Sequence, residues 1–237
     1  MEFFRDIWTW LGTEQSNSVP IWYLITALLF GFSLYFFKIT HRITKLIGSL
    51  IHEAGHAIVA LVLGMRVSRI KLDSHGNGVT EFYSFSRIRN FPVALAGYLA
   101  PPSLAVALAY AVMSGYLNLA LAILIFTFLI LSIFVRSITA LLTNIILGFI
   151  IYFAFESSPW ISEGIVFLLI GILLSGGIFA VLSAYKVRKS GNRETKTDPQ
   201  VLSSMTLILP SIIWEFAFAI YAICATIYII RLLISPI

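Results

Sequence analysis

The sequence has few charged residues and almost no cysteine. Only 11% of its 237 residues are Asp, Glu, Lys or Arg, whereas about a quarter of a soluble domain is charged. The single cysteine, Cys224, lies in an apolar run, which excludes an intrachain disulfide and a cysteine-based zinc cluster. Its polar segments reach only roughly 25 residues, too few for a second folded domain. Residues 1–237 are therefore expected to form a single domain.

Long apolar runs are what the sequence has in abundance. Hydrophobic residues make up 59% of the chain, and they fall into blocks of about 17 to 24 residues, the length that a helix needs to cross a hydrocarbon core of about 30 Å. The pattern predicts an all-α polytopic membrane protein with six or seven transmembrane helices. The candidate helices are 21–37, 43–64, 92–113, 117–135, 138–155, 161–185 and 208–230.

Two segments outside these blocks have their own character. Residues 1–20 are expected to be an extramembrane N-terminal segment, because no signal-peptide cleavage site follows the first apolar block. Residues 66–90 are expected to form a β-hairpin loop. Alternating side chains at 67–72 and 79–83 flank a turn that contains Gly76-Asn77-Gly78, a pattern typical of a hairpin.

The positive charges lie mainly in short connections between apolar blocks. The net charge of +5 is therefore interpreted as a topology signal for the lipid bilayer, and no nucleic-acid partner is expected. Lys38, Arg42 and Lys45 precede the second block, and the basic loop 186–199 follows the sixth, so both are expected on the cytoplasmic side. The number of spans between them conflicts with this placement, so one segment, 138–155 or the hairpin, must be re-entrant or merged with another.

The second block contains a metal-binding pattern. His52-Glu53-Ala54-Gly55-His56 is H-E-x-x-H on a predicted helix, and a spacing of four residues places both imidazoles on one face, where they can share one ion. Glu53 then lies beside the metal as general base, able to take a proton from a water that the metal has made more acidic. The alternative is a chance pair of histidines packed in a helix. Three ionisable groups are costly to insert into a membrane helix unless they share a ligand or a polar cavity, which favours zinc.

Four segments give the chain a resemblance to a known family. They are 52–57, which contains the His-Glu motif, 76–80 (Gly-Asn-Gly-Val-Thr), 96–102 (Ala-Gly-Tyr-Leu-Ala-Pro-Pro), and 197–214, from Thr-Asp-Pro-Gln-Val-Leu to Leu-Pro and Trp. In these segments the chain resembles the site-2 protease family of intramembrane zinc metallopeptidases, in its compact branch without a PDZ domain. Only the first motif is specific on its own.

A catalytic zinc ion usually has three protein ligands and one open position, so a third ligand must join His52 and His56. The resemblance implies Asp198. Asp198-Pro199 is also a typical helix start, with Asp as N-cap and Pro at the first helical position. Glu215 is the competing ligand, because a carboxylate inside the last apolar block needs a function or a partner, such as Arg136.

One position departs from the family pattern. Many members continue the Ala-Gly segment with Pro-x-x-Asn, and that Asn helps hold the substrate carbonyl, whereas the matching positions here are Tyr98 and Pro101. Asn144 is the candidate substitute, although an Asn that bonds between helices is the alternative interpretation.

The resemblance implies a zinc-dependent intramembrane endopeptidase that hydrolyses peptide bonds in or near transmembrane segments by a metal-activated water. The expected partner is a membrane-protein substrate with a single span or a signal anchor, and the branch suggests a bacterial-type inner membrane. Because a membrane helix must unwind before cleavage, its extended backbone is expected to pair with the hairpin at Gly78, Val79 and Thr80. A purely structural hairpin is the alternative. Two other functions remain open: a zinc enzyme acting on a lipid or small molecule, and a non-proteolytic scaffold or transporter that retains the zinc site.

Overall fold

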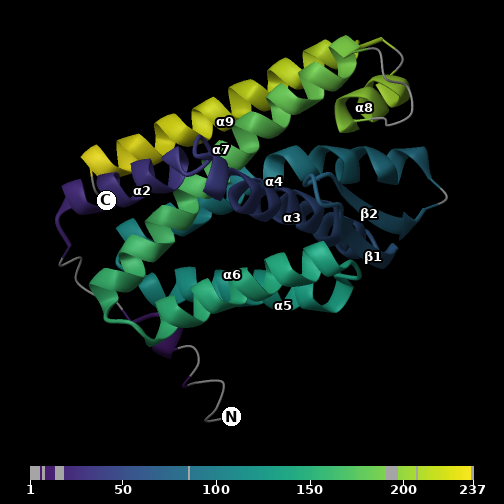
Figure 1. The fold of residues 1–237 in the computed structure, drawn as a ribbon. Helices are drawn as coiled ribbons and strands as arrows, with labels where there is room; N and C mark the ends of the chain where they lie inside the picture. Colours follow the sequence, from purple (N-terminus) through teal and green to yellow (C-terminus); the bar gives the residue numbers. More distant parts are fainter. Residues whose placement is uncertain are drawn as a thin grey trace.

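The computed structural model describes residues 6, 9–13, 19–84, 86–190, 197–206 and 208–235. Helices dominate this part of the chain, and a short hairpin interrupts them after the helix Lys38–Val62 (Figure 1). The elements are α2 (Ile21–Ser33), α3 (Lys38–Val62), β1 (Arg66–Leu72), β2 (Gly78–Tyr83), α4 (Arg87–Met113), α5 (Leu117–Phe134), α6 (Ile138–Glu156), α7 (Pro159–Ser190), α8 (Asp198–Thr206) and α9 (Ser211–Ile234).

Six of the described helices are long and apolar enough to cross a membrane: α3, α4, α5, α6, α7 and α9. Helix α2 has only 13 residues, about 20 Å at 1.5 Å per residue, which is short of the hydrocarbon thickness. The predicted all-α polytopic fold with one hairpin is therefore confirmed. The segment suspected of not crossing, 138–155, corresponds to α6 and is among the six. The short helix α2 precedes Lys38, so it does not change the number of long helices between the two basic segments.

Several predicted boundaries differ from the structure. Helix α4 begins at Arg87, inside the stretch expected to be loop, and α7 continues to Ser190. The basic residues Lys186, Arg188 and Lys189 therefore extend a helix and do not begin a loop. At 32 residues, α7 is about 48 Å long, so it reaches beyond the hydrocarbon core and carries these cations past it. Residues 191–196 of the predicted basic loop, and most of the predicted N-terminal segment, lie outside the described residues.

Helix α7 packs closely against both α2 and α3 through glycines. A Cβ added at Gly171 would overlap the Leu28 carbonyl of α2, and one added at Gly31 would overlap the Leu168 carbonyl of α7. Where α3 crosses α7, a Cβ on Gly48 would lie 3.1 Å from the Gly176 Cα. Small residues let membrane helices approach backbone to backbone. These contacts join α2, α3 and α7 into one wall.

The hairpin is held on one side and free on the other. Its antiparallel strands pair from Arg66 with Tyr83 to Leu72 with Gly78. The α5–α6 connection covers the outer edge of β1: the Arg136 N–H donates to the Ile70 carbonyl, and Ser137 Oγ bonds both backbone groups of Leu72 at 2.9 and 3.1 Å. Among the described residues, the backbone of β2 hydrogen-bonds only to β1. Strand β2 is thus the open edge of the hairpin.

Candidate metal centre and active site

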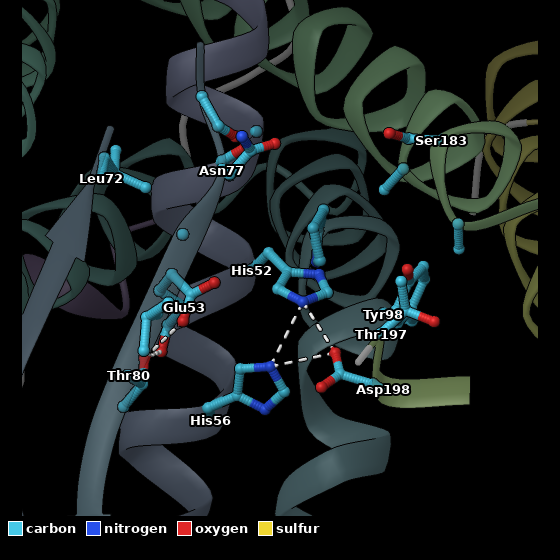
Figure 2. Close-up of a pocket in the computed structure, with 18 of the residues that line it drawn as sticks. His52, Glu53, His56, Leu72, Asn77, Thr80, Tyr98, Ser183, Thr197 and Asp198 are labelled. Atoms are coloured by element: carbon cyan, nitrogen blue, oxygen red, sulfur yellow. Dashed lines mark hydrogen bonds and ion pairs between the residues drawn. The ribbon is translucent and has the colours of Figure 1, made fainter. Parts of the chain in front are cut away.

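The two histidines of α3 point toward one another on one face of the helix (Figure 2). Their Nε2 atoms are 3.2 Å apart, and their rings stand nearly perpendicular, at 82°. His56 is buried, and His52 is half-buried at the edge of a cavity. The spacing of four residues is about one helical turn, so the two imidazoles lie one above the other on the same face of α3, as the sequence predicts.

Asp198 completes a group of three donors. Its Oδ2 lies 3.0 Å from His52 Nε2 and 3.2 Å from His56 Nε2. Figure 2 shows the carboxylate meeting the two rings from α8, on the side opposite to the hairpin. In the described residues, these three are the one group of His, Cys, Asp or Glu side chains that could hold a metal ion, with donor atoms within 4.8 Å of one another. The carboxylate implied by the resemblance is therefore beside the histidines.

The start of α8 explains how Asp198 is available. The alternative role for Asp198 was that of N-cap, but Asp198 is itself the first helical residue, and Thr197 precedes it. The Gln200 side chain accepts a hydrogen bond from the Thr197 N–H at 2.9 Å, which is the Gln half of a capping box with Thr197 as N-cap. The Asp198 carboxylate, at the first helical position, faces the histidines of α3.

His56 is held in the tautomer that a metal ligand needs. Its Nδ1 lies 2.6 Å from the Val93 carbonyl of α4, an acceptor, so Nδ1 carries a proton and Nε2 is the nitrogen that faces His52 and Asp198 and is left to bind a metal. Gly97, one turn further along α4, leaves the space that the donors face. A Cβ there would lie 2.5 Å from His52 Nε2 and closer still to His56 Nε2.

The donor geometry fits a zinc ion. Ligands of a tetrahedral zinc at about 2.0 to 2.1 Å lie about 3.3 Å from one another, and the three separations here are 3.0, 3.2 and 3.2 Å. Two imidazoles and one carboxylate are also a donor set found in catalytic zinc sites, which keep a fourth position open. The bare backbone of Gly97 lets α4 lie against the two Nε2 atoms without displacing them.

The histidines keep Asp198 ionised. Burial alone would raise the pKa of this carboxyl, but the charge of His56 and the hydrogen bonds from both histidines outweigh burial and hold the pKa well below its ordinary value. Metal ligands must be deprotonated, and Asp198 is in that state already.

Glu53 lies next to the histidines without joining them. It is 4% exposed, and one of its carboxylate oxygens accepts a hydrogen bond from Thr80 of β2 at 2.6 Å. In Figure 2 the other oxygen is directed toward the histidine pair. This is the arrangement that the motif predicts for a general base.

A cavity of about 1210 Å³ opens over these side chains. It is larger than the 300 to 1,000 Å³ of typical small-molecule pockets. Its walls come from α3, the hairpin, α4, α7 and the start of α8, and Gly78, Val79 and Thr80 all line it. The three hairpin residues expected to contact substrate are therefore at the site.

Other sequence candidates lie elsewhere. Glu215 Oε1 forms an ion pair with Arg188 Nε of α7 at 2.8 Å. Its partner is therefore Arg188, and neither a metal cluster nor the expected Arg136. The expected position of Asn144 was wrong: it donates to Ser132 Oγ across the α5–α6 pair at 2.9 Å and is absent from the cavity lining. The alternative interpretation, a bond between helices, describes it.

Sequence reasoning assigned no role at the histidines to two contributors from α4, although Gly97 lies in the 96–102 segment that carries the resemblance. The Val93 carbonyl has no sequence signal, because any residue carries one. Gly97 had a signal, since a glycine inside a membrane helix often marks a close approach. The neighbouring Tyr98 packs its ring 4.8 Å from that of His52 and stacks on Phe218 of α9. Helix α4 thus supports the histidine pair from behind.

Comparison with known proteins agrees with this site. A family model described as Peptidase M50B-like matches residues 19–229. No curated protein and no solved structure matches the chain. The matched range includes the histidine pair, the hairpin and Asp198. With a match over nearly the whole sequence, the chain belongs to the Peptidase M50B-like family, and hence to the site-2 proteases.

Proposed function

We propose that this protein is a zinc-dependent intramembrane endopeptidase that hydrolyses peptide bonds in or near transmembrane segments of membrane proteins. The observation that carries the proposal is the convergence of His52, His56 and Asp198, from segments 146 residues apart, beside the carboxylate of Glu53. The membership in a family of intramembrane metallopeptidases supports it.

Each residue has a distinct role in the proposed reaction. His52 Nε2, His56 Nε2 and Asp198 Oδ2 hold the metal, and Val93 keeps His56 in the required tautomer. A zinc ion bound there would make a water molecule more acidic and would polarise the scissile carbonyl. The free oxygen of Glu53 accepts the proton from the attacking water and returns it to the departing amine nitrogen.

The open edge of β2 offers a place for the substrate backbone. A transmembrane helix satisfies its own backbone hydrogen bonds, so the bond to be cut must first be unwound. The unwound segment then needs new hydrogen-bond partners, which an unpaired strand edge supplies. Strand β2 has that edge, and it lines the same cavity as Glu53.

The test combines metal analysis with cleavage of single-span membrane substrates in reconstituted vesicles. The wild-type protein is expected to bind one zinc ion and to cleave. Glu53→Gln should retain zinc and lose cleavage by at least about 100-fold, the lower range for a general base. Asp198→Asn should lose zinc, whereas Glu215→Gln, a carboxylate outside the cluster, should keep it.

Two results would contradict the proposal. Cleavage that survives in Glu53→Gln would remove the general base from the mechanism. A wild-type protein that binds zinc but cleaves no tested span would favour the zinc-retaining scaffold or transporter.

A further inference from the structure

Strand β2 touches the general base directly. Thr80 Oγ lies 2.6 Å from Glu53 Oε2 and 3.1 Å from the Glu53 backbone carbonyl. The shorter distance is that of a charge-assisted hydrogen bond from a hydroxyl to a carboxylate. Glu53 is buried, and no cation pairs with it in the described residues. Among the described residues, Thr80 is thus the one side chain that donates a hydrogen bond to this carboxylate.

Gly78 faces the other oxygen of the same carboxylate. A Cβ built on Gly78 would overlap Glu53 Oε1 and would lie 2.6 Å from Cγ and 2.7 Å from Cδ. The backbone φ angle of Gly78 is not positive, so its conformation is one that other residues also adopt. The glycine is therefore needed for space and not for its conformational freedom.

We propose that β2 positions the general base, with Thr80 fixing Oε2 of Glu53 and the bare backbone of Gly78 leaving Oε1 free to carry the proton. This inference rests on the proposed function and assigns to Thr80 and Gly78 a role in addition to contact with substrate. Both are positioning residues, because they act through Glu53.

Positioning matters at this place for a physical reason. A glutamate side chain has several rotatable bonds. The carboxylate of Glu53, next to the histidines, can therefore take several orientations relative to the metal position. An unrestrained Glu53 would sample orientations in which it cannot meet the attacking water, and a misplacement of about 1 Å can cost about 100-fold in rate. The Thr80 hydrogen bond selects one orientation, which Figure 2 shows with the second oxygen toward the histidines.

The hairpin offers a matched control. In the described residues, three side-chain hydrogen bonds tie it to α3: Thr80 to Glu53, Ser49 Oγ to the Gly76 carbonyl at 2.7 Å, and Lys45 Nζ to the His75 carbonyl. Only the Thr80 bond reaches the base. If hairpin attachment were all that mattered, removing either hydroxyl would have the same consequence.

The kinetic test compares Thr80→Val, Thr80→Ser and Ser49→Ala in reconstituted, zinc-loaded protein. Thr80→Val keeps the side-chain shape but removes the donor, and it should lower kcat about 100-fold with KM changed less than about threefold. Thr80→Ser restores the hydroxyl and should recover kcat to within about threefold of wild type. Ser49→Ala should likewise stay within about threefold.

A second measurement does not depend on activity. In metal-free protein, the carboxylate stretching band of Glu53 can be isolated by subtracting the infrared spectrum of Glu53→Gln. The band should shift in Thr80→Val, which removes the hydrogen bond, and should stay in place in Thr80→Ser and Ser49→Ala. Gly78→Ala approaches the base from the other side and should lower kcat to a similar extent.

The outcomes separate this inference from the proposed function. Wild-type cleavage with equal kcat in Thr80→Val, or equal losses in Thr80→Val and Ser49→Ala, would overturn the positioning role and leave the peptidase intact. An unmoved Glu53 band in Thr80→Val would also overturn it. If Thr80→Val does not fold, full kcat in Gly78→Ala refutes the proposal. A wild-type protein without any cleavage would instead refute the proposed function.

Discussion

Gly97→Ala should destroy the metal site without removing a ligand. The new methyl carbon would lie 2.5 Å from His52 Nε2 and closer to His56 Nε2. Non-bonded heavy atoms rest about 3.5 Å or more apart, so the rings must retreat by about 1 Å. Zinc–ligand distances tolerate only about 0.2 Å of deviation. The displacement is several times this tolerance, so at least one imidazole should leave the ion.

The expected magnitude is at least a 100-fold loss of zinc affinity. Changes to residues that merely support ligands cost about 10- to 100-fold, and displacing a ligand should cost no less, which corresponds to about 2.8 kcal/mol. The assay is competition with a chelating dye in purified, detergent-solubilised protein. Gly177→Ala is the control, because its added Cβ meets only the Pro102 ring, at 3.3 Å from Cδ and 3.8 Å from Cγ. A Gly97→Ala protein that binds zinc within threefold of wild type would refute the reasoning.

Three further predictions concern stability, each measured as a shift in thermal unfolding in detergent. Arg188→Met should destabilise by about 3 kcal/mol because it leaves the buried Glu215 carboxylate unpaired, and adding Glu215→Gln should recover part of the loss; equal losses in the single and double variants would contradict this. Gly171→Ala should cost about 3 kcal/mol or more, since its methyl would overlap the Leu28 carbonyl of α2; an unchanged midpoint would show that the two helices can part. Ser137→Ala should cost about 1 to 3 kcal/mol, because Leu72 loses both of its edge hydrogen bonds; no change would mean that water replaces the hydroxyl.

The features that the sequence predicted are those with a local cause. Apolar block length identifies membrane helices because the bilayer has one thickness, and the pair His52 and His56 needs only helical periodicity to converge. The hairpin follows in the same way from alternation around a glycine-rich turn.

The features that the sequence did not predict depend on contacts between distant segments. Helix α8 has only nine residues, too short for a periodic pattern, and the sequence marks only its start, at Asp198-Pro199. Nothing in the local sequence distinguishes Glu215, paired with Arg188, from a metal ligand, because both are carboxylates that need a partner. The same holds for Asn144, because the sequence does not distinguish a buried amide that contacts substrate from one that bonds between two helices, as Asn144 does.

The order of the donors along the chain has a consequence for biogenesis. His52 and His56 are made early, whereas Asp198 follows His52 by 146 residues, after five of the six long helices. A nascent chain that has not yet reached Asp198 offers a metal only two imidazoles. Capture of the ion, and with it the proposed cleavage of membrane proteins, therefore waits until α7 and the start of α8 have been made. Before that point the proposed peptidase is inert.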